Sequence, residues 1–488
     1  MKKKLLVLLI LVFVLSPLPS VIAVAGAPFE SYRFDFYGYE IAIPNPYHAV
    51  KSVSGRDLGI ADFVNPTDFF VRDDMVYLLD AGASQIVIFD EYLNLINVIG
   101  DLNYNGVSDS FNSPQGIFVG HDHVIYVADT ENRRVVVLDD SGNIIRTISN
   151  PESDSIPEDF IFLPEKLVAD TAGRVFVVAR NMFEGIMSFD REGEFFGFFG
   201  TVEVTFSPID LFWRTVATQA QRARLGLFLP TEFSNIAIDP EGFIYATIID
   251  TAGDRDFIMR INAMGRNVLT NYSPLAIQGD FNFRLFGDFS GASTFVDIIY
   301  RGYGIYSALD FTRNRIFTYD GEGNLLYVFG GPGNAMGMLR SPVAIEYLGD
   351  NILVLDAARR EVVFFAPTEY GRFINTATAM RFIGDEEQSV YYWRRVLALD
   401  AHYELALSGI GRSLLAANEY REAMVYLRRA LDYRNYSIAF SRHRNQVLRD
   451  NLPIVFTVAV VGAVVWVSFK IYKRVKPMFV KTSLAGGE

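Results

Sequence analysis

The sequence predicts a mainly β protein: a six-bladed β-propeller followed by a small α-helical segment and one transmembrane helix. Three observations carry this prediction: six copies of a four-strand pattern, a change to helical periodicity after residue 374, and an uncharged apolar run at 452–469. Half of the 488 residues are hydrophobic, which is enough for a large core, and the chain contains no cysteine. Disulfides, thiolate metal sites and cysteine nucleophiles are therefore excluded.

Six copies of the strand pattern begin at residues 65, 113, 163, 229, 295 and 341. Each copy contains four short apolar strands separated by polar turns. A proline opens the first strand at Pro66, Pro114, Pro164, Pro230 and Pro342. An aspartate ends the second strand at Asp80, Asp129, Asp250, Asp310 and Asp356, and Arg180 is aligned there in the third copy. Because the aspartate recurs, it predicts a structural role, accepting backbone N–H bonds of the following turn.

A single four-stranded unit of this kind cannot bury its two apolar faces. In a closed ring of blades, each face is buried against the neighbouring blade. The copy at 113–148 contains Pro-x-Gly at 114–116, Ile-Tyr-Val-Ala-Asp at 125–129, Asn-x-Arg-Val at 132–135 and a glycine turn at Gly142. In these motifs it resembles NHL-repeat propellers, and the resemblance spans about residues 47–376. It implies a six-bladed propeller over 26–376. Residues 50–54 are expected to close the ring beside the last blade, with 372–374 as the competing segment.

The two ends of the chain predict its location. Three lysines, an apolar run at 5–15 and Ala-Val-Ala at 23–25 indicate a signal peptide over 1–25, with an uncleaved anchor as the alternative. The run within 452–472 indicates a transmembrane helix, and the lysines and arginine that follow it predict a basic cytoplasmic tail at 473–488. The expected location is the cell membrane, single-pass, with the propeller on the extracytoplasmic side.

Residues 380–450 have helical periodicity and form the predicted stalk. The segment 403–433 resembles a tetratricopeptide repeat, with small and large residues at Leu407, Ile410, Gly411, Leu414, Tyr420, Ala423, Leu427 and Ala430. Two interpretations stay open: a spacer between propeller and membrane, and a docking surface for another membrane protein. The layout as a whole resembles bacterial surface proteins.

A ligand is expected at the mouth of the central channel, on the face where the links between blades emerge. Inserts at 201–228 and 271–293 fall in these links, and the first is either a lid or a segment packed on the propeller. The candidate ligand-binding residues at this mouth are Asp68, Gln115, Lys166, Arg180, Trp213 and Glu232.

One loop has the spacing of a calcium site. Asp101, Asn103, Asn105 and Asp109 supply oxygen ligands around Gly106, although position twelve is an asparagine instead of a glutamate. The stretch also resembles the calcium loops of integrin-type propellers. Calcium here would bind weakly and stiffen the loop. A second candidate pair, His121 and His123, lacks an evident third ligand and is interpreted as a solvated turn.

The net charge and the sequence motifs limit the classes of function that are open to this protein. The net charge of −13 disfavours nucleic acid as a partner, and neither a phosphate-binding loop nor a nucleophile elbow is present. The sequence therefore favours a membrane-anchored binding or scaffold protein. The resemblance implies a protein partner such as a membrane transport complex, for example a sugar-uptake transporter. The alternative function is a calcium-dependent, lactonase-like hydrolase on the same propeller.

Overall fold

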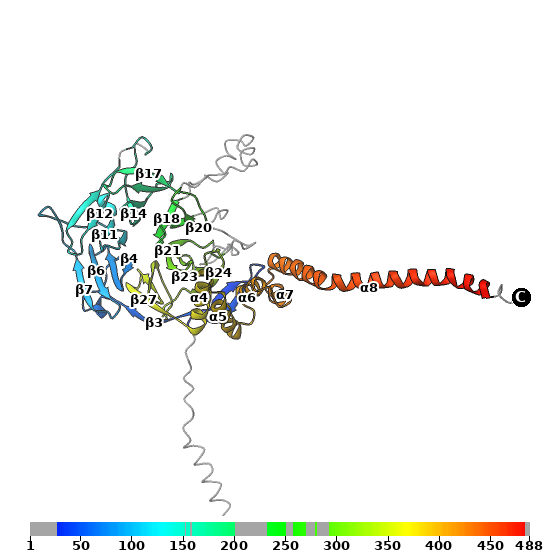
Figure 1. Cartoon of the computed structure of the whole chain (residues 1–488). Helices are drawn as coiled ribbons and strands as arrows, with labels where there is room; N and C mark the ends of the chain where they lie inside the picture. The colour runs from blue at the N-terminus through cyan, green and yellow to red at the C-terminus, as the bar shows by residue number, and fades with distance from the viewer. Residues whose placement is uncertain are drawn as a thin grey trace, which may run out of the picture. The chain divides into compact units, whose positions relative to one another are not determined.

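The computed structural model describes residues 27–151, 153–156, 159–200, 232–249, 257–269, 279–280 and 292–483, with side chains up to residue 474. Two compact units divide the chain, one ending at Arg372 and the other beginning at Phe373. The first is the β-propeller, whose sheets are arranged around a central axis (Figure 1). The second is helical.

Six antiparallel sheets form the blades. Blade 1 contains β4 (Pro66–Arg72), β5 (Met75–Asp80), β6 (Gln85–Asp90) and β7 (Leu95–Ile99), and blade 2 contains β10 (Gly116–Val119), β11 (Ile125–Asp129), β12 (Arg134–Leu138) and β13 (Ile144–Ile148). Blade 3 contains β14 (Pro164–Ala169), β15 (Val175–Ala179), β16 (Ile186–Phe189) and β17 (Phe195–Phe199), and blade 4 contains β18 (Glu232–Ile238), β19 (Ile244–Ile249) and β20 (Ile258–Ile261). Blade 5 contains β21 (Phe295–Gly302), β22 (Ile305–Asp310), β23 (Arg315–Tyr319) and β24 (Leu325–Gly330). Blade 6 contains β25 (Pro342–Leu348), β26 (Asn351–Asp356) and β27 (Glu361–Pro367).

The ring is closed by an N-terminal strand. β3 (Tyr47–Val53) pairs antiparallel with β27 as the fourth strand of blade 6, which is the role expected for residues 50–54. The competing segment, 372–374, lies in helix α4 (Glu369–Phe382). Closure by a distant part of the chain leaves no open seam between the first and last blades.

A second N-terminal element was not expected from the sequence. The hairpin of β1 (Ser31–Phe34) and β2 (Glu40–Ile43) extends the outer edge of blade 5, where Tyr32 pairs with Val328 of β24. The Tyr32 hydroxyl donates to the Asp280 carboxylate, which also accepts a hydrogen bond from Arg315 at 2.8 Å. These contacts fix the hairpin to blade 5.

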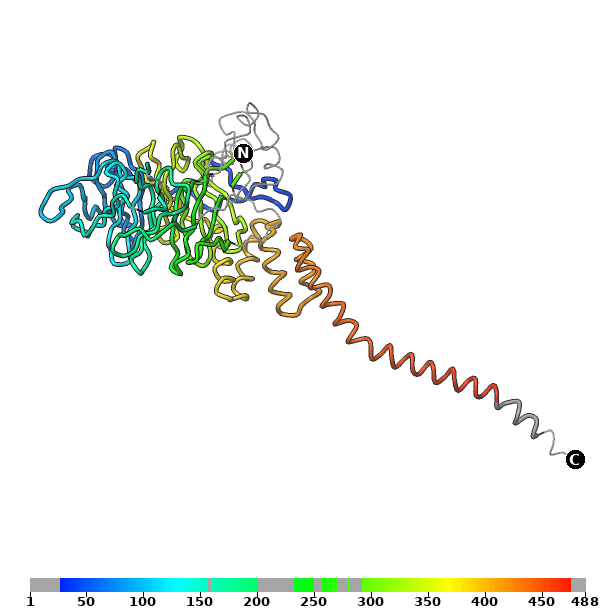
Figure 2. The backbone as a smooth tube through the Cα atoms, turned by 90° about the horizontal axis from the view of Figure 1, so that it is seen from above, coloured from blue at the N-terminus to red at the C-terminus, as the bar shows by residue number. Residues whose placement is uncertain are grey.

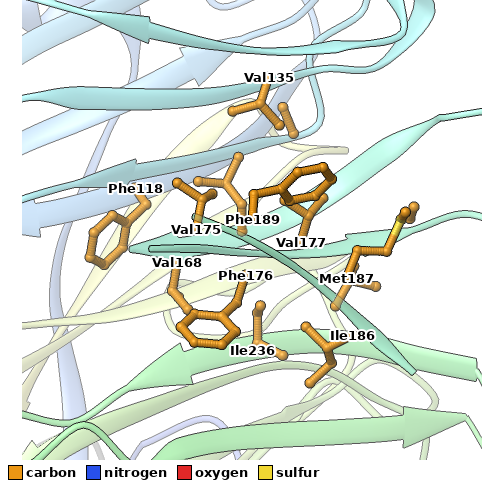
Figure 3. Close-up of a cluster of buried hydrophobic side chains, with 14 of the residues drawn as sticks. Phe118, Val135, Val168, Val175, Phe176, Val177, Ile186, Met187, Phe189 and Ile236 are labelled. Carbon is orange, nitrogen blue, oxygen red and sulfur yellow. The ribbon is translucent and has the colours of Figure 1, made fainter. Parts of the chain in front are cut away.

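The core lies between the blades. Each blade is covered on both faces, so its middle strands are apolar throughout; all five residues of β11 and of β15 are buried. Figure 3 shows one cluster, in which Phe118 of blade 2, Val168 and Phe176 of blade 3 and Ile236 of blade 4 belong to the same packed group.

The recurring aspartates have the predicted structural role, since Asp310 and Asp356 accept backbone N–H groups of the following turn from Thr312 at 3.0 Å and from Arg359 at 3.1 Å. They also accept N–H groups of the link before the first strand, which was not predicted. The Asp80 carboxylate accepts the backbone N–H groups of Val64 and Asn65 at 2.8 Å, in the link before the first strand, and that of Ala83 in the following turn only at 3.4 Å. Asp356 likewise accepts from two link residues at 2.7 and 3.1 Å. Each aspartate therefore anchors the incoming link.

The third and fourth copies depart from this pattern. Pro164 pairs with Ala179, whereas Pro66 pairs with Asp80, so the alignment of Arg180 with the aspartates was wrong by one residue. The register of blade 3 is the same as that of blade 1, but Ala179 replaces the aspartate that marks this place in the sequence. Asp250 lies outside the described residues.

Unit 2 consists of helices. They are α4, α5 (Glu386–Leu399), α6 (Glu404–Ala416), α7 (Tyr420–Arg429) and α8 (Tyr433–Ser483). Glycine permits close packing of α6 on α7, since a Cβ atom at Gly411 would lie 2.6 Å from Cγ of Leu427. The Ser389 hydroxyl of α5 donates to the Ala377 carbonyl of α4 at 2.9 Å.

Helix α8 is long and continuous (Figure 2). Its middle part, residues 452–469, is an uncharged apolar run. Its described part contains one candidate membrane span, with a mean hydropathy of 2.4 and no buried residue in the most apolar window. Length, composition and outward-facing apolar side chains indicate that this helix anchors the protein in a membrane.

Candidate functional site

The hairpins between the first and second strands of the six blades surround a cavity of about 1090 Å³. We call this cavity the funnel. Its lining comes from every blade and includes Arg72, His121, Asp170, Asp239, Arg301 and Tyr347. The first strands β4, β10, β14, β18, β21 and β25 contact one another in a ring around the axis and end at these hairpins. A cavity of this volume matches the sites that hold small molecules.

Glu346 differs from its counterparts in the other blades. Pairing registers place it at the same strand position as Phe70, Phe118, Val168, Ala237 and Ile299. Five blades thus supply an apolar side chain where blade 6 supplies a carboxyl. Glu346 is only 7% exposed and lines the funnel. Among the described residues its carboxyl forms no ion pair, and its one close donor is the backbone N–H of Tyr347. We call Glu346 the funnel floor.

A layer of polar side chains lies two residues earlier on the first strands. Lys166 Nζ is 2.9 Å from Asp68 Oδ2, and that carboxylate also accepts the backbone N–H of Ile117 at 3.0 Å. Asp297 accepts from Asn235 Nδ2 at 2.5 Å and from the backbone N–H of Ile345 at 2.6 Å. We call Asp68, Lys166, Asn235 and Asp297 the channel layer. The two carboxylates satisfy backbone donors of the next blade that no strand ladder reaches.

Glycine lets blades 2 and 3 approach within this layer. Gly116 occupies the equivalent position in blade 2, and a Cβ atom there would lie 2.3 Å from the Glu165 carbonyl oxygen. Blade 2 therefore presents no side chain at this level, and Lys166 of blade 3 pairs with Asp68 of blade 1.

Buried carboxyls dominate the electrostatics. Burial raises the pKa of Asp68, although Lys166 opposes the rise. Burial, with the Asp68 charge adding to it, raises the pKa of Asp297 to about 7. Burial raises the pKa of Glu346 well above its usual value, and the charges of Asp297 and Asp68 raise it further. The ammonium group of Lys166 opposes the rise for Asp68 and Asp297, and the charge of Arg72 opposes it for Glu346.

The nearest arginines are held by other groups. Arg72 donates through Nε and Nη2 to the Val119 carbonyl at 3.1 and 2.9 Å, and its guanidinium lies 5.2 Å from the Phe70 ring centre. Arg301 donates to Asp350 at 2.6 Å and lies over the Tyr347 ring. These cations are fixed to the wall and the rim, and neither forms an ion pair with Glu346.

The residues predicted for the link-face mouth fall into two groups. Asp68 and Lys166 meet in the channel layer. Arg180 Nε donates to Glu165 at 2.6 Å, and Glu232 accepts the Asn181 backbone N–H at 2.9 Å. Gln115 Nε2 donates to the Ser113 carbonyl at 3.2 Å. Trp213 lies outside the described residues. Gln115, Arg180 and Glu232 are at the link end of the strands, away from the funnel. The role of all six predicted residues in ligand binding stays a prediction.

The proposed calcium loop forms a β-hairpin. β8 (Leu102–Tyr104) and β9 (Val107–Asp109) flank a turn in which Asn105 and Gly106 both have positive φ. Asn103 Oδ1 accepts the Gly106 N–H at 2.8 Å, and Asp109 pairs with both terminal nitrogens of Arg134 at 2.7 and 3.1 Å. Asp101 is exposed. Calcium binding stays a prediction, and it would require Asp109 to leave Arg134.

Histidines and carboxylates elsewhere give no metal centre within the described ranges. His123 Nε2 lies 3.4 Å from Asp73, while His121 contacts Arg72. Across the described part of the chain, no group of three or more histidines, aspartates or glutamates is placed to hold one ion.

Reasoning from the sequence missed Glu346, Asp297 and Arg72. The available signal was positional: Glu346 occupies a place in the repeat where the other copies have apolar residues. That signal becomes clear only when the register of all six first strands is known.

No family model matches the chain. No curated protein matches it. Among solved structures, virginiamycin B lyase from Staphylococcus aureus aligns with a TM-score of 0.38 and 13% identity, covering 65% of this chain and 98% of that one. A protein of unknown function from Bacteroides thetaiotaomicron aligns with a TM-score of 0.41 and 10% identity, covering 70% and 76%. At these scores and identities the likeness carries no activity over to this chain. The fold class follows from the structure of this chain alone: a six-bladed β-propeller followed by helices, with one candidate membrane span in the described residues.

Proposed function

We propose that the protein is a membrane-anchored binding protein that takes a small ligand in the funnel of its propeller. The observation that supports this most is the cavity of about 1090 Å³ with a buried, unpaired carboxyl, Glu346, at its floor. Binding sites combine an apolar wall with a few polar groups that orient the ligand. The funnel has this composition, since Phe118, Tyr126 and Glu346 are all among its lining residues.

The proposed placement is a signal peptide, an NHL-like propeller and a tetratricopeptide-like segment outside the cytoplasm, and a cytoplasmic C-terminus. Lys470, Lys473 and Arg474 follow the apolar part of α8, and cytoplasmic flanks of membrane spans are enriched in such residues. The acidic balance of the whole chain, −13, suits a propeller in a salty exterior.

The helical unit is proposed to dock a second membrane protein, such as a transport complex. Its helices pack closely, as at Gly411 against Leu427, and leave large apolar side chains such as Val425 exposed. A lactonase-like hydrolase is not favoured, because calcium-dependent hydrolysis needs a convergent set of ligands, and the described residues contain no such group.

Blocking the funnel tests the proposal. Ala172 is exposed in a hairpin of blade 3 and lines the funnel, so Ala172→Trp fills the mouth without entering the core. Ser141→Trp is the matched control: Ser141 is also exposed, two residues after an aspartate whose carboxylate accepts its N–H, but it does not line the funnel.

The full chain in detergent is screened by thermal shift against calcium, EDTA, sugars, lactones and cell-wall fragments. A ligand that raises the melting temperature of the wild type and of Ser141→Trp, but not that of Ala172→Trp, supports binding in the funnel. An equal rise in all three proteins shows that the ligand binds elsewhere and refutes this use of the funnel.

A further inference from the structure

Uncompensated negative charge is buried beneath the funnel. Glu346, Asp68 and Asp297 are each at most 7% exposed, and the only ammonium group among them, Lys166, pairs with Asp68. Burying a carboxylate without a partner is costly, so such a group either binds a proton or finds a cation. Among the described residues no cation forms an ion pair with Glu346: the charge of Arg72 acts on it, but Arg72 donates to Val119 and Arg301 to Asp350.

Contacts between blades do not explain why a glutamate occupies position 346. Asp68 and Asp297 each accept a backbone N–H of the neighbouring blade, which gives them a structural role. Glu346 bridges no blades, and the five equivalent positions are apolar. Its side chain borders the funnel, where a ligand would meet it first.

The wall above the floor is suited to an apolar body. Phe118 lies 4.9 Å from Phe70 and 6.1 Å from Tyr126, measured between ring centres, and all three line the cavity. Tyr300 and Tyr347 line it from blades 5 and 6. Aromatic surfaces attract both apolar groups and cations.

We infer that the ligand of the funnel is an organic amine, whose protonated nitrogen pairs with the Glu346 carboxylate while its apolar body packs against the aromatic wall. This inference rests on the proposed function, because it names the chemical class of the ligand for the same cavity. The ion pair would form at a carboxyl that is only 7% exposed, where it is stronger than at the surface.

Binding of the amine is coupled to a proton. The charged groups that act on Glu346 are Asp68 and Arg72 from β4, Asp297 from β21 and, through Asp68, Lys166 from β14. His121 contacts Arg72 at the rim. Burial raises the pKa of Glu346 and so favours its protonated form in the empty funnel, and an arriving ammonium group would displace that proton. The affinity therefore rises with pH, up to the pKa of the amine itself.

Tyramine and tyrosol form a matched pair of probes, because they differ in having an ammonium or a hydroxyl group at the end of the same aromatic body. Each is titrated calorimetrically into the full chain in detergent, in two buffers of different ionisation enthalpy. We expect tyramine to bind at least about tenfold more tightly than tyrosol and to release protons on binding. Glu346→Gln removes the preference, and Glu346→Asp retains part of it. Glu91→Gln, in an exposed turn, leaves it unchanged.

The outcomes separate this inference from the proposed function. Equal binding of both probes, abolished by Ala172→Trp, refutes the amine and leaves the funnel as the site. A preference for tyramine that persists in Glu346→Gln also refutes the inference. Failure of both probes to bind at about 10 mM counts against it as well, while the ligand screen decides the proposed function independently.

Discussion

Replacing Glu346 with glutamine is expected to stabilise the propeller, and to do so more strongly as the pH rises. The ordinary pKa of glutamate is about 4.5, and burial beside Asp297 and Asp68 raises that of Glu346 well above it. Between these two values the folded protein binds more protons than the unfolded chain. The stability of the wild type therefore falls as the pH rises through this range. Glutamine does not titrate and escapes this loss.

The magnitude follows from the width of the pH interval. Each pH unit over which Glu346 stays protonated in the fold, and ionised in the unfolded chain, costs about 1.4 kcal/mol. Between about pH 5 and pH 8 the stability gap between Glu346→Gln and wild type can therefore widen by at most about 4 kcal/mol. Each kcal/mol corresponds to about 2–4 °C in melting temperature for a domain of this size.

Thermal and urea unfolding of the full chain in detergent measure this gap at both pH values, without ligand. Glu91→Gln, which removes an exposed carboxyl, is the control and is expected to show no such widening. A gap that stays constant between the two pH values, or a variant that is less stable than wild type at the higher one, would refute the assignment of Glu346 as a buried, unpaired carboxyl.

Three further substitutions test the fold. Lys166→Met leaves Asp68 buried without its cation and should lower the free energy of unfolding by about 3–5 kcal/mol. The double variant with Asp68→Asn should recover part of this loss. A double variant as unstable as the sum of the two single variants would contradict the pairing. Asp356→Ala leaves link N–H groups unsatisfied and should cost about 2–4 kcal/mol in urea unfolding, and an unchanged midpoint would contradict the anchoring role. Gly411→Val should destabilise the helical unit by about 1–3 kcal/mol, measured by circular dichroism. Gly462→Ala is the control and should be tolerated, because a Cβ atom at Gly462 meets open space. Equal stability of the two variants would show that α6 and α7 do not pack closely.

Much of the propeller could be predicted because its information is local and repeated. A proline at the start of the first strand and an aspartate at the end of the second recur in most blades. The contacts of Asp80 and Asp356 show why the aspartate recurs, since it anchors the link that begins the blade. The ring-closing strand was recognisable for the same reason, since residues 50–54 lie just before the first copy. Repetition compensates for the weakness of any single short strand as a signal.

Where the repeat is interrupted, prediction failed. In the third copy Ala179 stands where blade 1 has Asp80, so the aspartate that marks this place is missing and Arg180 was aligned there instead. The β1–β2 hairpin was missed because its attachment depends on Asp280, far along the chain from Tyr32. The contact between Tyr32 and Asp280 leaves no periodic trace in the sequence.

The candidate site was harder to predict than the fold. Asp68 and Lys166 were predicted as ligand-binding residues at the link-face mouth, and that role stays a prediction. The structure pairs them in the channel layer, and the cavity lies at the hairpin end of the strands. Glu346 stands within an ordinary strand sequence, Pro-Val-Ala-Ile-Glu-Tyr-Leu, and only its five apolar counterparts make it unusual. A site built from six distant blades depends on register and burial, which a single sequence encodes only indirectly.

An experimental structure of the full chain with a ligand from the thermal-shift screen would test directly whether the funnel is the binding site. We expect ligand density inside the funnel, with a polar atom of the ligand within hydrogen-bond distance of the Glu346 carboxyl. Density at the opposite mouth, beside Arg180 and Glu232, would contradict it and return the site to the link face.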